Sequence, residues 1–286
     1  MKSRRKFLGN VALTTAALST LPHWAAPLEI DMAGKSISSL GLILDIVKKE
    51  MLNDAESTLS QISKLGYTKL EFSEYYGYSK AEFKKLIQTH GFQSVAGGGS
   101  MYDLQDNFDD KINDAVFFEK EYLVCYWPWM DDGSNKTLDD FKKLADTFNT
   151  LGRKCKKEGL KLAFHAHDKE FYKINDTVPY DILLKNTDKD LVAMELDLYW
   201  IKKGGQDPLK YVQNYGDRFS LIHVKDMDNS AERNITCPGD GIIDFKSIFN
   251  ELSKYKNVHY LVERDRAVNG MQCLTDSADY LFGLRW

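Results

Sequence analysis

Residues 161–167 read Lys-Leu-Ala-Phe-His-Ala-His, a short apolar run that ends in two histidines. Three later runs end in a similar way, with Leu-Asp at 196–197, Ile-His-Val-Lys at 222–225 and Val-Glu-Arg-Asp at 262–265. Each run has the length and composition of a buried strand. Four such strands, each finishing in side chains that can bind a metal ion, indicate a sheet whose strand ends converge on one site.

The pattern around these runs predicts the fold. From Ile37 onward, short apolar runs alternate with longer amphipathic stretches, as repeated strand–helix units require. Gly66, Gly91 and Gly159 follow predicted helix ends, where glycine is a favoured C-cap. Strands are expected at 39–46, 69–72, 94–97, 122–126, 161–165, 191–196, 219–224 and 260–263. Helices are expected at 54–64, 80–89, 107–118, 138–157, 180–185, 208–214, 244–254 and 275–282. Eight such units predict an α/β protein with a single domain, a (β/α)8 TIM barrel spanning 35–286.

Composition excludes several classes of protein. The chain of 286 residues has 43% hydrophobic and 28% charged residues, which excludes a disordered or collagen-like chain. Its 38 Lys and Arg against 42 Asp and Glu give a formal charge of −4, so nucleic acid is not an expected partner. The four cysteines are widely spaced without a Cys-x-x-Cys motif, and we expect no essential disulfide. Cys125 lies in an apolar run and is expected in the core.

The first 26 residues have the pattern of an export signal. A basic segment at 1–7 precedes a mainly apolar segment at 8–21. The pair Arg4-Arg5 resembles a twin-arginine signal, and an ordinary secretory signal is the alternative. The apolar segment is shorter than the roughly 20 residues of a bilayer span, so stable membrane insertion is not expected. We therefore expect an exported, periplasmic protein.

Four strand-end residues are expected to hold one divalent metal ion: His165, Asp197, His223 and Glu263. Neighbouring barrel strands lie about 4.8 Å apart, so polar groups at matching heights converge above the core. Without an ion, this many buried polar groups would be costly. Mixed nitrogen and oxygen ligands suit Mn²⁺, Zn²⁺, Co²⁺, Ni²⁺ or Mg²⁺ and do not select among them.

His167 and Lys225 are expected to face the substrate. Because side chains alternate along a strand, His167 shares a face with His165, and Lys225 shares one with His223. One member of each pair can therefore bind the metal while the other contacts the substrate. Glu170 lies three residues beyond His167 and is either a further ligand or a substrate contact. The other histidines are expected to be non-catalytic: His23, His90 and His259.

Five segments together resemble the sugar phosphate isomerase/epimerase family, which has a xylose-isomerase-like TIM barrel. They are 164–171, 196–200, 223–226, 239–244 and 262–265. The resemblance covers the chain after the signal. It implies one divalent metal bound by an acid on the fifth strand, an Asp on the sixth, a His on the seventh and a Glu on the eighth.

This resemblance assigns roles residue by residue. Asp197, His223 and Glu263 match the family's ligands. His165 stands where many members have Glu, so either His165 or Glu170 supplies the remaining ligand. The resemblance also implies that His167 and Lys225 lie near the substrate and that Glu71 is a second-strand acid that contacts it. The segment 96–100 has no histidine, which argues against the AP-endonuclease branch.

The expected reaction is isomerisation or epimerisation of a free or oxidised sugar through an enediolate. The metal would polarise a carbonyl, His167, Glu170 or Glu263 would transfer the α-proton, and Lys225 would neutralise developing negative charge. Tyr199 and Trp200 are expected to contact the sugar by stacking. One alternative is a 3-keto-glycoside lyase or hydratase that uses the same metal site. Another is an exported carbohydrate-binding barrel without turnover.

Overall fold

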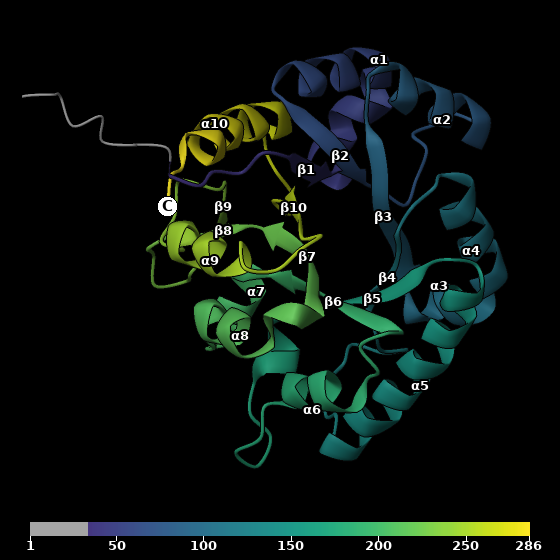
Figure 1. The fold of residues 1–286 in the computed structure, drawn as a ribbon, viewed down its shortest axis with the longest axis vertical. Helices are drawn as coiled ribbons and strands as arrows, with labels where there is room; N and C mark the ends of the chain where they lie inside the picture. Colours follow the sequence, from purple (N-terminus) through teal and green to yellow (C-terminus); the bar gives the residue numbers. More distant parts are fainter. Residues whose placement is uncertain (1–33) are drawn as a thin grey trace, which may run out of the picture. The chain divides into compact units, whose positions relative to one another are not determined.

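The computed structural model describes residues 34–286. The predicted export signal at 1–26, with His23, lies outside these residues. Eight parallel strands form a closed barrel in the order β1-β10-β7-β6-β5-β4-β3-β2, and helices surround it (Figure 1). The predicted (β/α)8 TIM barrel is therefore confirmed. Among the described residues, no helix is both long and apolar enough to cross a membrane.

The strands and helices alternate along the chain. The barrel strands are β1 (Leu40–Ile43), β2 (Tyr67–Glu71), β3 (Gln93–Ser100), β4 (Tyr122–Trp127), β5 (Lys161–His165), β6 (Val192–Asp197), β7 (Phe219–Val224) and β10 (His259–Val262). The short strands β8 (Asp226–Met227) and β9 (Ile235–Thr236) form an antiparallel pair outside the barrel. The α-helices are α1 (Lys48–Lys64), α2 (Lys80–Thr89), α3 (Met101–Asp106), α4 (Phe108–Phe117), α5 (Leu138–Lys157), α6 (Pro179–Asn186), α7 (Leu198–Lys203), α8 (Pro208–Tyr215), α9 (Phe245–Leu252) and α10 (Gly270–Gly283). The 3-10 turns are η1 (Leu44–Val47), η2 (Asp168–Phe171) and η3 (Gly216–Arg218).

Several helix and strand boundaries in the structure differ from the predicted ones, and each difference has a local cause. The first strand ends at Ile43 because residues 44–47 form the turn η1. Helix α1 begins before the predicted start at Asp54, where the backbone is kinked and the side chain accepts a hydrogen bond from the Ser57 amide. The helix predicted at 107–118 is preceded by the short helix α3, which Ser100 caps. Helix α7 was not predicted, and the Asp197 side chain caps it.

Alternation along the strands creates the barrel interior. Small and apolar side chains fill one layer, formed by Val95, Ala96, Tyr122, Val124, Ala163, Ala193, Leu221 and Leu261. The residues two positions further along the later strands are His165, Glu195 and His223, and they lie one layer closer to the carboxyl ends. The apolar layer therefore forms a floor beneath the polar residues.

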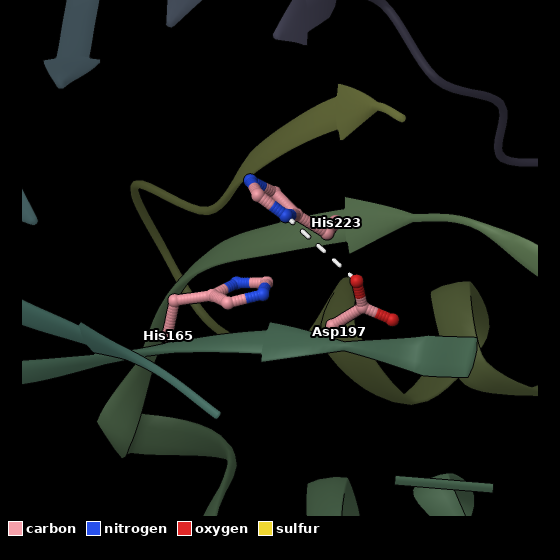
Figure 2. A group of neighbouring side chains, drawn as sticks. All are labelled: His165, Asp197 and His223. Carbon is pink, nitrogen blue, oxygen red and sulfur yellow. Dashed lines mark ion pairs between the residues drawn. The ribbon is translucent and has the colours of Figure 1, made fainter. Parts of the chain in front are cut away.

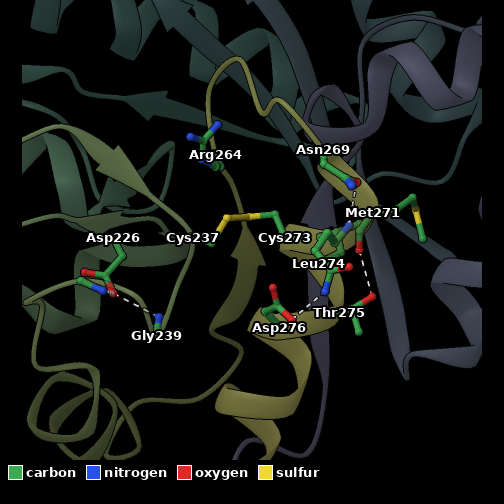
Figure 3. Close-up of a disulfide and its surroundings, with 12 residues drawn as sticks. Asp226, Cys237, Gly239, Arg264, Asn269, Met271, Cys273, Leu274, Thr275 and Asp276 are labelled. Atoms are coloured by element: carbon green, nitrogen blue, oxygen red, sulfur yellow. Dashed lines mark hydrogen bonds between the residues drawn. A yellow bond between two sulfur atoms is a disulfide. The ribbon is translucent and has the colours of Figure 1, made fainter.

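A disulfide corrects one of the sequence predictions. We expected no essential disulfide, but the structure joins Cys237, just after β9, to Cys273 in α10 (Figure 3). Their Cα atoms lie 5.6 Å apart although 36 residues separate them in sequence, so their spacing gave no sign of the bond. Cys125 and Cys155 are buried free thiols, which confirms the core position of Cys125.

The loop that carries Cys237 has a second anchor at Asp226. Its carboxylate accepts a hydrogen bond from the backbone amide of Gly239 at 3.1 Å (Figure 3). It accepts another from the amide of Gly241, also at 3.1 Å. A Cβ at Gly241 would lie 2.2 Å from the Asp226 carboxylate, so only glycine allows this approach. The loop is thus held beside Lys225, the residue that precedes Asp226.

Candidate metal centre at the mouth of the barrel

Three of the predicted metal ligands converge at the carboxyl ends of neighbouring strands. His165 ends β5, Asp197 ends β6 and His223 lies on β7, and each offers a ligand atom within 4.8 Å of the other two (Figure 2). The fourth predicted ligand, Glu263, follows β10, and its Oε2 lies 2.7 Å from His223 Nδ1. All four residues are buried. The structure therefore brings the complete predicted ligand set together.

Several atoms of this group are buried without a well-directed hydrogen bond. They are His165 Nδ1, Asp197 Oδ2, His223 Nδ1 and Glu263 Oε2. Buried polar atoms are nearly always satisfied, because an unsatisfied one costs about 1–3 kcal/mol. Two imidazoles and two carboxylates are a donor set that divalent transition metals accept. These residues therefore fit a divalent cation.

The two oxygens of Asp197 have different surroundings. Oδ1 accepts hydrogen bonds from the amides of Tyr199 and Trp200 at 2.9 Å, which fixes the side chain at the start of α7. Oδ2 faces His223 across 3.9 Å. One oxygen thus anchors the side chain, and the other faces His223 and lies 2.8 Å from Lys225 Nζ.

Two carboxylates lie behind His223. Its Nε2 is 2.9 Å from Glu71 Oε2 and 3.2 Å from Glu195 Oε1, while Nδ1 faces Asp197 and Glu263. Burial lowers the pKa of His223, but Glu195, Glu263 and Glu71 together raise it well above its ordinary value. Metal-binding histidines commonly donate their second N–H to a carboxylate, which fixes the tautomer. The arrangement at Nε2 therefore leaves Nδ1 as the ligand atom of His223.

Glu195 is a buried residue of the candidate site that our reading of the sequence missed. It is fully buried on β6, and its Oε2 lies 3.3 Å from His165 Nδ1. Burial and the neighbouring Glu71 raise its pKa to about 8. The available signal was alternation, because Glu195 lies two residues before Asp197 and so faces the same side of the strand.

Lys225 contacts three carboxylates. Its Nζ lies 2.8 Å from oxygens of Asp197, Glu263 and Asp265, and the side chain is fully buried. Burial lowers the pKa of Lys225, but these carboxylates raise it above its ordinary value, so the lysine is a cation. Burial raises the pKa of Asp197 to about 6, although Lys225 opposes this shift. Lys225 therefore compensates part of the negative charge of the site.

His167 and Glu170 occupy different places. His167 lies on the wall of the cavity described below, and burial lowers its pKa to about 4, which makes it neutral at pH 7. Glu170 instead accepts hydrogen bonds from the His167 amide at 2.8 Å and from Trp129 Nε1 at 3.4 Å. Burial raises its pKa to about 7. Within residues 34–286, two groups of side chains could hold an ion: His165 with Asp197 and His223, and Glu71 with Glu195 and His223. Glu170 belongs to neither group.

A cavity of about 450 Å³ opens above the ligands. Its wall includes His165, His167, His223 and Glu263 at one end and extends past the ends of β1, β2 and β3 to Lys48 and Lys111. This volume lies within the range for small-molecule sites. The predictions missed the wall residues from the early strands because, apart from Glu71, the ends of β1, β2 and β3 carry no metal-binding side chain.

The three predicted substrate contacts lie off this wall. Glu71 lies behind His223 and also accepts a hydrogen bond from Tyr126 at 2.5 Å. Tyr199 is buried and donates to the Arg233 carbonyl. The Trp200 ring centroid lies 5.3 Å from that of His167 and 5.3 Å from Lys225 Nζ, so this side chain packs against two residues of the site.

The two remaining histidines in the described residues lie elsewhere. His90 is the C-cap of α2. His259 begins β10, and its ring nitrogens lie 3.0 Å from Lys69 Nζ and 3.2 Å from Glu121 Oε2. It therefore sits at the opposite end of the barrel from His223.

The fold and these residues together define a TIM barrel with a candidate metal centre at the carboxyl ends of its strands. The chain belongs to the xylose isomerase-like TIM barrel family, whose model matches residues 59–282. A crystal structure of a sugar phosphate isomerase/epimerase from Parabacteroides distasonis is similar, with 26% identity and a TM-score of 0.72. That match covers 87% of this chain and 94% of the other.

Two further relatives carry informative names. An inosose dehydratase from Clostridium beijerinckii is 30% identical over 132 residues, which cover 41% of this chain and 44% of that protein. The match thus spans less than half the length of that relative. The IolI protein, crystallised with a bound zinc atom, is 15% identical with a TM-score of 0.68, covering 86% of this chain and 100% of the other. This last likeness shows the fold alone.

Proposed function

We propose that this protein is a divalent-metal-dependent enzyme that acts on a free or oxidised sugar by moving the proton next to a carbonyl. The observation that carries this proposal is the convergence of His165, Asp197, His223 and Glu263, several of whose buried atoms lack a hydrogen bond. Three of them, His165, His223 and Glu263, also line the cavity. The names of the Parabacteroides and Clostridium relatives, a sugar phosphate isomerase/epimerase and an inosose dehydratase, support a sugar-like substrate.

The four ligand residues would hold the cation, which when bound supplies Lewis-acid polarisation of the carbonyl. His167 is neutral at pH 7 and lies on the cavity wall, so its imidazole can accept the α-proton. Lys225 is a fixed cation in contact with Asp197 and Glu263, and it would stabilise the negative charge that develops on the substrate oxygen. Return of the proton to the neighbouring carbon, with a proton passing from the α-hydroxyl to the former carbonyl oxygen, completes isomerisation. Epimerisation instead requires a second donor, such as water, to deliver a proton to the other face of the same carbon.

A second candidate reaction is elimination. After the same proton transfer to His167, a C–O bond on the adjacent carbon breaks and the leaving oxygen takes up a proton, giving water or an alcohol and an unsaturated ketone. The relative named inosose dehydratase favours this candidate. Its substrates would be keto-cyclitols or 3-keto-glycosides.

Exchange of the α-proton in D₂O tests the proposal. Chelator-treated protein would be given Mn²⁺ and then a panel of ketoses, inososes and 3-keto-glucosides, with NMR used to follow deuterium incorporation and product formation. We expect metal-dependent incorporation, and the product then distinguishes isomerisation from elimination. The control variant is Glu158→Gln, at the exposed end of α5. Binding of sugar without exchange would instead support a carbohydrate-binding barrel.

We also propose that the protein is exported to the periplasm through the signal at 1–26. The disulfide between Cys237 and Cys273 supports this, because disulfides persist in oxidising compartments. Cell fractionation of the full chain and of the Arg4→Lys, Arg5→Lys variant tests it. We expect the full chain in the periplasm and retention of the variant in the cytoplasm, whereas equal export of both would exclude the twin-arginine route.

A further inference from the structure

We infer that Glu195 is a positioning residue that orients His165 and His223 as metal ligands. The inference rests on the proposed metal site and adds a residue to it. Its basis is a juxtaposition: one buried carboxylate lies between two histidines, with one oxygen close to each ring. Oε2 is 3.3 Å from His165 Nδ1, and Oε1 is 3.2 Å from His223 Nε2.

The position of Glu195 in the barrel brings its carboxyl group close to both histidines. Glu195 is paired with His165 in the register between β5 and β6, and a register irregularity at Met194 and Glu195 precedes the pairing of Asp197 with His223. The side chain is 0% exposed. It therefore has no access to solvent and depends on the two histidines and Glu71 for its polar contacts.

Such a carboxylate is costly to bury unless N–H groups satisfy it. Two imidazole N–H groups can do so, and each donation would leave the other ring nitrogen of that histidine with a free lone pair. For His223 this free nitrogen is Nδ1, which lies 3.9 Å from Asp197 Oδ2 and 2.7 Å from Glu263 Oε2, where the ion would be held. The carboxylate behind a ligand also makes the imidazole a stronger donor to the metal.

Glu71 does not duplicate this role. Its Oε2 lies 2.9 Å from His223 Nε2, and its Oε1 is occupied by the hydroxyl of Tyr126. In the part of the chain that the structure describes, the ion-pair contact of His165 is with Glu195 alone. Loss of the Glu195 carboxyl group is therefore expected to affect His165 most, whereas loss of the Glu71 carboxyl group affects His223.

A second ion bound by Glu71, Glu195 and His223 is the competing interpretation, because ligand atoms of these residues also lie within 4.8 Å of one another. His223 Nε2 is hydrogen-bonded to Glu71 at 2.9 Å, and Glu195 Oε1 lies 3.2 Å from the same nitrogen, so this nitrogen already faces two carboxylates. We therefore assign Glu71 and Glu195 as groups behind a single ion.

Titration of chelator-treated protein with Co²⁺, followed by visible absorption, tests this inference. For the wild type we expect one ion per chain and an absorption band typical of nitrogen and oxygen ligands. Glu195→Gln is nearly isosteric and is expected to bind Co²⁺ about 10–100-fold more weakly, with an altered spectrum. In a His165→Ala background, the same substitution should have little further effect. Glu158→Gln serves as the matched control on an exposed surface.

The possible outcomes separate the two proposals. A wild type that binds no ion overturns the proposed metal enzyme. A wild type that binds one ion, together with Glu195→Gln of unchanged affinity and spectrum, overturns the role of Glu195 and leaves the metal site intact. Two ions per chain would also overturn it. If Glu195→Gln fails to fold, Glu195→Asp replaces it, and an unchanged affinity and spectrum in that variant would contradict the inference.

Discussion

The carboxylate of Glu170 accepts a hydrogen bond from the backbone amide of His167 at a distance of 2.8 Å. The turn η2 between them folds the chain back on itself, and Trp129 donates to the other carboxylate oxygen. Glu170 thus fixes the backbone that presents His167 to the cavity. This geometry favours His165 over Glu170 as the ligand contributed by the segment after β5.

Glu170→Ala separates these two roles. We expect turnover to fall by about 100-fold, because a shift of about 1 Å in a catalytic group has an effect of that size. Metal content, measured by inductively coupled plasma mass spectrometry, should remain at the wild-type level. His165→Ala should lose the ion as well as the activity. Loss of the metal from Glu170→Ala would identify Glu170 as a ligand and refute the assignment.

Lys225→Met tests the charge balance of the site. Without Lys225, the carboxylates of Asp197 and Glu263 lose their shared cation, and removal of one partner from a buried ion pair costs about 3–5 kcal/mol. We expect this loss in the free energy of unfolding of chelator-treated protein, measured by urea denaturation. Added Mn²⁺ should then stabilise the variant more than the wild type. An equal effect of Mn²⁺ on both proteins would show that Lys225 and the ion do not share the same carboxylates.

The buried Lys120 predicts a pH dependence of stability. Its Nζ donates to the Phe72 carbonyl at 2.6 Å, and burial lowers its pKa to about 7. Between pH 7 and 10.5 the unfolded chain therefore binds one proton more than the folded protein, so stability rises with pH. Relative to Lys120→Met, the wild-type free energy of unfolding should increase by about 1.4 kcal/mol per pH unit between pH 7.5 and 9.5.

Urea denaturation at pH 7.5 and 9.5 measures this difference. Lys156→Met, on the exposed side of α5, is the control and should follow the wild type. Parallel pH profiles for the wild type and Lys120→Met would mean that Lys120 keeps its charge in the folded protein.

The disulfide between Cys237 and Cys273 is expected to stabilise the protein. It closes a segment of 36 residues, for which the loss of unfolded-state entropy corresponds to about 2–4 kcal/mol. Reduction of the wild type should lower the free energy of unfolding by this amount, and Cys237→Ser, Cys273→Ser should match the reduced protein with or without reductant. If reduction does not change stability, the bond has no structural role.

Much of the fold could be predicted from sequence because the strands are short, apolar and bounded by clear signals. The strands predicted at 161–165 and 219–224 coincide with β5 and β7, and the helices predicted at 80–89 and 138–157 coincide with α2 and α5. The short helices α3 and α7 were missed because side-chain caps at Ser100 and Asp197 start them, rather than a hydrophobic period.

The site could be predicted only in part. Its ligands stand at strand ends, where polarity changes abruptly, and this is why His165, Asp197, His223 and Glu263 were found. Glu195 was missed because it lies inside an apolar strand, and the cavity wall near Lys48 was missed because it depends on how loops from several strands meet. The disulfide was missed for the same reason, since only the folded chain brings its two cysteines together.

Metal binding by the purified protein tests the central claim most directly. Isothermal titration of chelator-treated wild type with Mn²⁺ and Zn²⁺ should show one ion per chain for at least one of the two metals. Glu263→Gln, verified as folded by circular dichroism, should bind that ion at least 10-fold more weakly. A wild type that binds neither ion, or a variant that binds as tightly as the wild type, would contradict the account.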